Sequence, residues 1–434
     1  MSNTRSQNYS IVLSKIALVR IIDSKSINLL FKTNVSRSRF IRKAIDQKHI
    51  RKIQIKERKH NDRKVDTYYQ ITGEGIRFLS GQETDIFEMI SSQTSMALFS
   101  RSEARPEVRT RQADVSTAII LCHAAGAVVP PETFGSMAAS EEDGTTIPTY
   151  ETEIPTVSSA DKPIYTLRNF YRDHLVEESA LYQNTFAKDA DEEEEDYIIF
   201  HDRGLVKETL AARSINHEIR DFFSGRYAGI LDSNFKSAIV YITPRFTMPW
   251  THWLIKAEIN AYRLWKRTNA LGAVQQQERS QETCIVVVDN AHDFAYHYLA
   301  KSRAKERREV FGGTYAHAYI VPNDKTGAIF LNWLMRTEDG DVIRDMTQFS
   351  IDAGEFFPNA NQASPQFIIR DNHGIETAIC MTFDVKQLNM ILYYIKDIHD
   401  KLFQIICFDW QKDYLRRIMP SNVVYRTFPM SIIQ

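Results

Sequence analysis

The chain has 434 residues, of which 43% are hydrophobic, 25% charged and 11% aromatic. This composition excludes a disordered or fibrous protein, and the length suffices for two or three globular domains. The net charge of −1 hides an uneven distribution. Residues 1–79 hold 18 Lys and Arg against 6 Asp and Glu, a net charge of +12, so the other 355 residues carry −13. A basic end on an acidic remainder predicts a polyanionic partner for that end.

The first 80 residues predict three helical segments. Apolar residues recur at helical spacing over residues 11–23, a short apolar turn follows at 26–31, and a third helix covers 36–50 with Ser36 or Ser38 as its N-cap. The apolar stripe of the third helix consists of Phe40, Ile41, Ala44 and Ile45.

The apolar period then changes from 3.6 to 2. Residues 50–58 (IRKIQIKER) alternate as in a strand, residues 59–66 are polar turn material, and residues 67–72 (TYYQIT) form a second strand before another helix at 73–79. This order is typical of a winged helix-turn-helix, in which the third helix docks by an apolar face and presents a cationic face to the major groove.

Cations are dense in this region. Residues 36–64 contain 12 Lys and Arg against 3 Asp and Glu. Counterion release turns this charge into affinity, and a protein that neutralises about six phosphates shows a log–log salt slope near −5. We therefore expect double-stranded DNA as the partner, bound without a cofactor. The expected contacts are Arg37, Arg39, Arg42 and Lys43 in the groove, Lys52 on the first strand, and Arg58, Lys59, Arg63 and Lys64 on the backbone. A solvated charged face and a protein-binding winged helix stay open as alternatives.

Residues 81–131 predict a helical connector, whose main helix ends at Gly126 before a Pro-Pro pair. Residues 132–163 are rich in Ser, Thr, Glu, Gly and Pro and predict a flexible linker or loop. Residues 188–196 hold seven acids, which indicates a solvated loop, with phosphate mimicry or cation binding as the alternative.

Residues 164–434 predict a larger α/β layered-sheet domain. A hairpin is expected over 227–243, and three continuous apolar strands each end in an Asp that precedes a helix. Continuous rather than alternating apolarity favours strands covered on both faces. The expected fold class is α/β, α+β overall, with the winged helix first and the layered domain after it.

The three aspartates that end these strands are Asp289, Asp384 and Asp409. Carboxylates at the carboxyl ends of strands hold Mg²⁺ in many α/β enzymes, so a metal-dependent DNA nickase or nuclease is one reading. Helix N-capping is the simpler reading and the one we favour. Because GxxxxGK[ST], HExxH and GxSxG patterns are absent from the sequence, we expect no metal site, no catalytic residues and a binding protein rather than an enzyme.

The four cysteines lie far apart without a CxxC pair, which predicts buried free thiols in a reducing compartment. The N-terminal residues are polar, and no run of about 18 apolar residues occurs. We therefore expect a cytoplasmic protein with no membrane partner. The cysteines are Cys122, Cys284, Cys380 and Cys407.

Tyr69, Ile71, Thr72 and Gly75 fit the pattern Y-x-[IL]-T-x-x-G, and the segments at 222–243, 248–265 and 319–334 add further similarity. On these residues the chain resembles the replication-relaxation proteins of plasmids and integrative mobile elements in Gram-positive bacteria. The resemblance implies an N-terminal winged helix, a larger α/β region, and a role in replication initiation, its control or DNA maintenance, with no catalytic residues to transfer. A dimeric transcriptional repressor is a further alternative. A homodimer and contacts with other replication or mobilisation proteins also stay open.

Overall fold

The protein is described by a computed structural model. It describes residues 2–56, 65–80, 106–127, 198–202, 206, 227–233, 235–243, 258–263, 282–299, 315–337, 356–358, 368–371, 373–396 and 402–433. The chain forms two compact units, one mainly from residues 1–120 and the other mainly from residues 222–259 and 281–434. Helices and sheets occur together in the described residues, which confirms the mixed α/β class.

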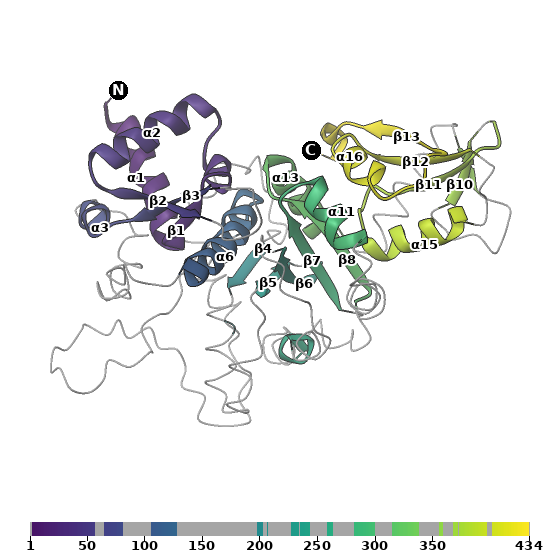
Figure 1. Ribbon diagram of the computed structural model, residues 1–434, viewed down its shortest axis with the longest axis horizontal. Helices are drawn as coiled ribbons and strands as arrows, with labels where there is room; N and C mark the ends of the chain where they lie inside the picture. The colour runs from purple at the N-terminus through teal and green to yellow at the C-terminus, as the bar shows by residue number, and fades with distance from the viewer. Residues whose placement is uncertain are drawn as a thin grey trace, which may run out of the picture. The chain divides into compact units, whose positions relative to one another are not determined.

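In its described residues, the first unit combines helices with a three-stranded antiparallel sheet (Figure 1). The sheet has the strand order β1-β3-β2. The elements are α1 (Ser2–Val19), β1 (Ile21–Asp23), the 3-10 helix η1 (Ser26–Leu30), α2 (Asn34–Asp46), β2 (Ile50–Lys56), β3 (Val65–Ile71) and α3 (Gly73–Ser80).

The first predicted helix extends beyond the observed C-terminal end of α1. It was expected to reach residue 23, but α1 ends at Val19 because Arg20 adopts a left-handed conformation with φ of 64°. The next three residues leave the helix and form β1, which pairs antiparallel with residues 68–70 of β3. The β-branched Ile21 and Ile22 suit a strand, and both are buried.

The predicted N-cap of α2 is also wrong. Thr33, rather than Ser36 or Ser38, has extended backbone geometry, and its hydroxyl accepts from the Ser36 backbone N–H at 3.2 Å. The Ser36 hydroxyl donates back to the Thr33 carbonyl at 2.8 Å. The helix therefore begins at Asn34, so its first turn contains Val35.

The pattern Y-x-[IL]-T-x-x-G has a structural explanation. Ile71 is buried at the end of β3, and the Thr72 hydroxyl donates to the His49 carbonyl at 3.0 Å and accepts from the Gly75 backbone N–H at 3.1 Å. A Cβ on Gly75 would lie 2.3 Å from the same His49 carbonyl oxygen. The threonine thus caps α3, and the glycine lets α3 approach the start of β2.

Helix α6 (Pro106–Ala124) follows, and its predicted end at Gly126 is confirmed. Gly126 has φ of 86°, and the Ala127 backbone N–H donates to the Cys122 carbonyl at 2.9 Å, as in a Schellman C-cap. The helix belongs to the first unit up to Ile120, and Ala113 packs in a cluster with the buried Ile21 and Tyr68.

A buried polar network joins α6 to β1 within the first unit. The Asp23 carboxylate accepts from the Ser26 hydroxyl at 2.6 Å and from the Thr117 hydroxyl at 2.8 Å. The other carboxylate oxygen accepts from the Lys25 and Ser26 backbone N–H groups at 2.6 and 2.8 Å. The carboxylate therefore organises the turn into η1 and holds the helix against it.

Two five-stranded sheets lie mainly in the second unit, one drawn in teal and green and the other in yellow-green and yellow in Figure 1. One has the order β4-β5-β6-β7-β8, with an antiparallel β5–β6 hairpin and parallel pairing from β6 to β8. Its strands are β4 (Ile198–Asp202), β5 (Tyr227–Ser233), β6 (Ser237–Ile242), β7 (Thr283–Val288) and β8 (His317–Pro322).

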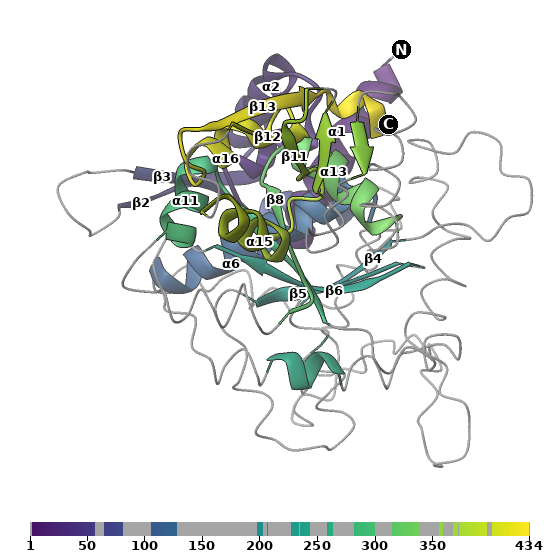
Figure 2. The ribbon, with the colours of Figure 1, turned by 90° about the vertical axis from the view of Figure 1, so that its right-hand side faces the viewer.

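The other sheet has the order β13-β12-β11-β10-β9, parallel over β11 to β13 and antiparallel over β9 to β11. Figure 2 shows β12 and β13 running side by side. Its strands are β9 (Phe356–Pro358), β10 (Ile368–Asp371), β11 (Glu376–Ile379), β12 (Phe403–Phe408) and β13 (Val423–Phe428).

Each of the three predicted strand–helix repeats is present. The helices of these repeats are α11 (Ala291–Leu299), α15 (Val385–Lys396) and α16 (Gln411–Arg416). Helix α13 (Lys325–Met335) follows β8, and η6 (Met430–Ile433) ends the described chain. All six residues of β7 are buried, as its continuous apolar sequence predicted. The four cysteines are buried free thiols, as expected. The predicted linker at 132–163 and the acidic run at 188–196 lie outside the described residues.

Candidate nucleic-acid interface

Helix α2 has one buried and one exposed side. Phe40 and Ala44 are buried against the rest of the first unit. At about 100° per residue, Val35 lies on the opposite side from Ala44, since nine residues separate them. Arg42 and Asp46 fall within about 20° of Val35 by the same rule. We call the stripe formed by Val35, Arg42 and Asp46 the outer stripe of α2.

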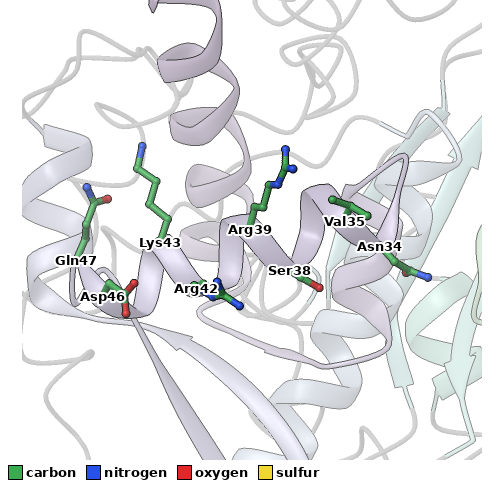
Figure 3. A pocket seen from close by; sticks show the side chains of 8 residues that line it. All are labelled: Asn34, Val35, Ser38, Arg39, Arg42, Lys43, Asp46 and Gln47. Carbon is green, nitrogen blue, oxygen red and sulfur yellow. The ribbon is translucent and has the colours of Figure 1, made fainter.

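An open concavity of about 730 Å³ runs along this side of α2 (Figure 3). Arg39 and Lys43 extend in one direction from the helix, while Asp46 lies on the same side as Arg42. The residues that line the concavity are Asn34, Val35, Ser38, Arg39, Arg42, Lys43, Asp46 and Gln47. The outer stripe is thus flanked by two cations on one edge.

Arg37 lies on a different side of the helix. It is half-buried, and its Nη1 donates to the Asn28 Oδ1 of η1. Seven residues separate Arg37 from the buried Ala44, which places the two within about 20° of each other around the helix. The geometry therefore separates Arg37 from the other three predicted groove residues and makes it a link between η1 and α2.

Lys43 is held by α1. Its Nζ lies over the Tyr9 ring at 4.4 Å from the centroid, a cation–π contact. The Tyr9 hydroxyl is hydrogen-bonded to His49 Nδ1 at 2.9 Å, and burial raises the pKa of Tyr9 to about 12. Burial lowers the pKa of His49; the Glu74 charge partly opposes this shift, and the Lys43 charge adds to it. His49 is consequently neutral near pH 7, and the charge of this surface comes from its arginines and lysines.

The structure brings only part of the predicted contact set together. Arg39, Arg42 and Lys43 are exposed on α2, and Lys52 is exposed on β2. The remaining four predicted contacts, Arg58, Lys59, Arg63 and Lys64, lie outside the described residues. Sequence reasoning missed the outer-stripe members Val35 and Asp46, although their spacing from Ala44 was visible.

The three strand-end aspartates differ from one another. Asp384 caps α15 as predicted, since its Oδ1 accepts from the Lys386 backbone N–H at 3.0 Å. It also joins the two sheets of the second unit, because the same oxygen accepts from the Ala318 N–H at 3.0 Å and its Oδ2 lies 2.9 Å from His317 Nδ1.

The cap predictions for the other two aspartates are wrong. Asn290 caps α11, since its Oδ1 accepts from the His292 and Asp293 backbone N–H groups at 2.9 and 3.0 Å. Asp289 instead accepts from the Asn323 side-chain amide at 3.3 Å. At α16 the N-cap residue is Trp410, which makes no side-chain cap, and Asp409 is exposed one residue before it.

Among the residues that the structure describes, no group of three or more His, Cys, Asp or Glu is arranged to hold a metal ion. No helix in the described ranges has the length and apolar character needed to cross a bilayer. Comparisons of the chain with protein-family models, with curated proteins and with solved structures return no match.

Proposed function

We propose that the first unit is a winged helix-turn-helix that binds double-stranded DNA by inserting α2 into the major groove. The element order α1-β1-η1-α2-β2-β3 and the sheet order β1-β3-β2 support this assignment. In such a domain η1 and α2 correspond to the two helices of the helix-turn-helix, and β2 and β3 correspond to the strands of the wing.

The observation that carries the proposal is the exposed side of α2. It presents Arg39, Arg42 and Lys43 along a concavity, with Arg42 opposite the docked side and Arg39 and Lys43 on the flank beside it. An α-helix about 10–12 Å in diameter fits the major groove, which is about 12 Å wide. A helix that is apolar inward and cationic outward can enter the groove without losing its own packing.

The uneven charge supports DNA binding by the N-terminal part of the chain and not by the remainder. Residues 1–79 carry +12, while the remainder carries −13 and is repelled by phosphate. DNA binding then belongs to the first unit alone. We propose that the protein acts in the cytoplasm on a plasmid or other mobile element, in replication initiation, its control or DNA maintenance, without catalysis of its own.

The test measures the affinity of the full-length protein for a labelled duplex of random sequence between 50 and 200 mM salt. The variant Arg39→Ala/Lys43→Ala is expected to lower the log–log slope by about 1.8, at roughly 0.9 per phosphate contact. The matched control is Arg77→Ala, because Arg77 is an exposed cation of the same unit whose Nη2 lies 3.1 Å from Glu74 on α3.

The control is expected to retain the slope of the wild-type protein. Binding that does not respond to salt, or an equal loss of slope in the control and in the α2 variant, would refute the proposal. A supercoiled plasmid nicked by the wild-type protein in Mg²⁺, but not by Asp409→Asn, would replace it with the nuclease reading.

A further inference from the structure

We infer that Val35 and Arg42 determine the sequence specificity of the proposed DNA-binding site, and that they read a thymine and a guanine about three base pairs apart. This inference rests on the proposed function and deepens it. It assigns base contacts to the outer stripe of α2 and phosphate contacts to its flank.

Val35 is an exposed apolar residue on α2. It is 59% exposed, more than any other large apolar side chain of α2, and it lies on the first turn directly opposite the docked side. A lone exposed valine needs no explanation in general. Here it lies at the N-terminal end of a surface whose other lining residues are polar or charged. The thymine C5-methyl is the apolar group that base edges present in the major groove, so it is the matching partner for this side chain.

Arg42 is the cation of the outer stripe. It lies on the same stripe seven residues later, which corresponds to about 10.5 Å along the helix axis. Base pairs are stacked about 3.4 Å apart, so this distance spans about three base pairs. Arginine in the major groove pairs with guanine through O6 and N7, the commonest specific contact. The stripe therefore fits a thymine and a guanine separated by about three steps.

Asp46 shows which side of α2 faces the bases. It is the single acid of the helix, and it shares the outer stripe with Val35 and Arg42. A carboxylate directed at phosphates would be repelled, whereas over base edges it meets the amino groups of cytosine. Arg39 and Lys43, turned toward the flank, are placed for the backbone instead. The distribution of charge therefore indicates that the outer stripe faces the base edges of the groove.

The experiment first selects bound sequences from a randomised duplex library with the full-length protein. In the selected site each thymine is replaced singly by deoxyuridine, which removes only the C5-methyl. We expect one position at which this replacement weakens wild-type binding about fourfold, the effect of one buried methyl group. At that position Val35→Ala should bind both duplexes equally.

The guanine is tested in the same way. Replacing a guanine about three base pairs from that thymine by 7-deazaguanine, which lacks the N7 acceptor, should weaken wild-type binding about tenfold. Arg42→Ala should be insensitive to the replacement. Arg77→Ala, the exposed control on α3, should respond to both base analogues as the wild-type protein does.

The outcomes separate the two proposals. Salt-dependent duplex binding with no methyl-sensitive thymine, or with equal sensitivity in Val35→Ala, overturns the inference and leaves the DNA-binding function standing. Failure of the wild-type protein to bind any duplex overturns both. Because Val35 and Arg42 are exposed, neither alanine variant threatens the folding of the first unit.

Discussion

Arg37 and Arg39 carry the same charge two residues apart, yet they lie on different sides of α2. Arg37 lies on the docked side of α2 and donates to Asn28 of η1. Arg39 is exposed and lines the concavity along the helix. Each alanine substitution removes one positive charge. Comparing the two variants therefore tests the orientation of α2 without a difference in net charge.

The expected effects differ in kind. Arg39→Ala should reduce the log–log salt slope of duplex binding by about 0.9, which is roughly 3.5-fold in relative affinity between 50 and 200 mM salt. Its effect on stability should stay within about 0.5 kcal/mol, as for an exposed side chain. Arg37→Ala should leave the slope unchanged but remove a hydrogen bond from a charged donor, with a cost of about 1 kcal/mol because the side chain is only half-buried.

Two measurements separate the variants. Fluorescence anisotropy with a labelled duplex at several salt concentrations gives the slope. Amide hydrogen exchange in the peptide that covers η1 and α2 reports local stability, and 1 kcal/mol corresponds to roughly fivefold faster exchange. If Arg37→Ala lowers the slope as much as Arg39→Ala, or if Arg39→Ala leaves it unchanged, the orientation of α2 proposed for DNA binding is wrong.

Three further predictions concern the scaffold. Thr117→Val removes the hydroxyl that donates to Asp23 at 2.8 Å, and urea unfolding should show that the free energy of unfolding falls by about 1–3 kcal/mol. An unchanged urea midpoint would mean that the Asp23 network does not contribute to stability. Gly327→Ala places a Cβ 1.7 Å from the Pro322 carbonyl oxygen and should lower the free energy of unfolding by about 3 kcal/mol or more. The control Gly374→Ala, at φ of 77° but with nothing within 4 Å of the added Cβ, should lower it by about 1 kcal/mol. Similar losses of stability in both variants would contradict the clash. Burial raises the pKa of the four cysteine thiols. Alkylation at pH 8 should therefore label none of them in the native protein and all four in urea. Rapid labelling of the native protein would show that the thiols are accessible.

The sequence predicted strands well where burial leaves a strong local mark. Strands β7 and β12 are continuous apolar runs, and both were expected together with the helices that follow them. Strand β1 was missed because Ile21 and Ile22 continue the apolar spacing of α1. What separates them from the helix is the backbone turn at Arg20 and pairing with β3, about 47 residues later in the chain. Neither can be seen in a local window.

The helix N-caps show a second limit of prediction from local sequence. In the sequence VDNAHD either Asp289 or Asn290 can cap the following helix, and the choice depends on where the first turn begins. At α2 the choice between Thr33 and Ser36 is likewise decided by the register of the helix. Residue type predicts that a cap exists, but packing selects which residue provides it.

For the candidate interface, composition predicted the cationic helix but not the direction of each side chain. Reading the segment by charge gave equal weight to Arg37 and Arg39 and passed over Val35. The helical period relative to the buried Phe40 and Ala44 contains the distinction, because it places Arg37 on the docked side and Val35 opposite to it. Periodicity was thus the better guide to the site once the docked side was known.

The Y-x-[IL]-T-x-x-G pattern and the outer stripe of α2 have separate roles in this unit. Thr72 caps α3 and donates to the His49 carbonyl, and Gly75 provides the clearance for α3 beside that carbonyl. None of these contacts involves Val35 or Arg42. The pattern therefore marks a scaffold that holds the end of α2 against β2 and α3, and it places no constraint on the residues that face outward. A chain with the same pattern can carry any outer stripe, so the sequence specificity proposed for this unit has to be tested on α2 itself.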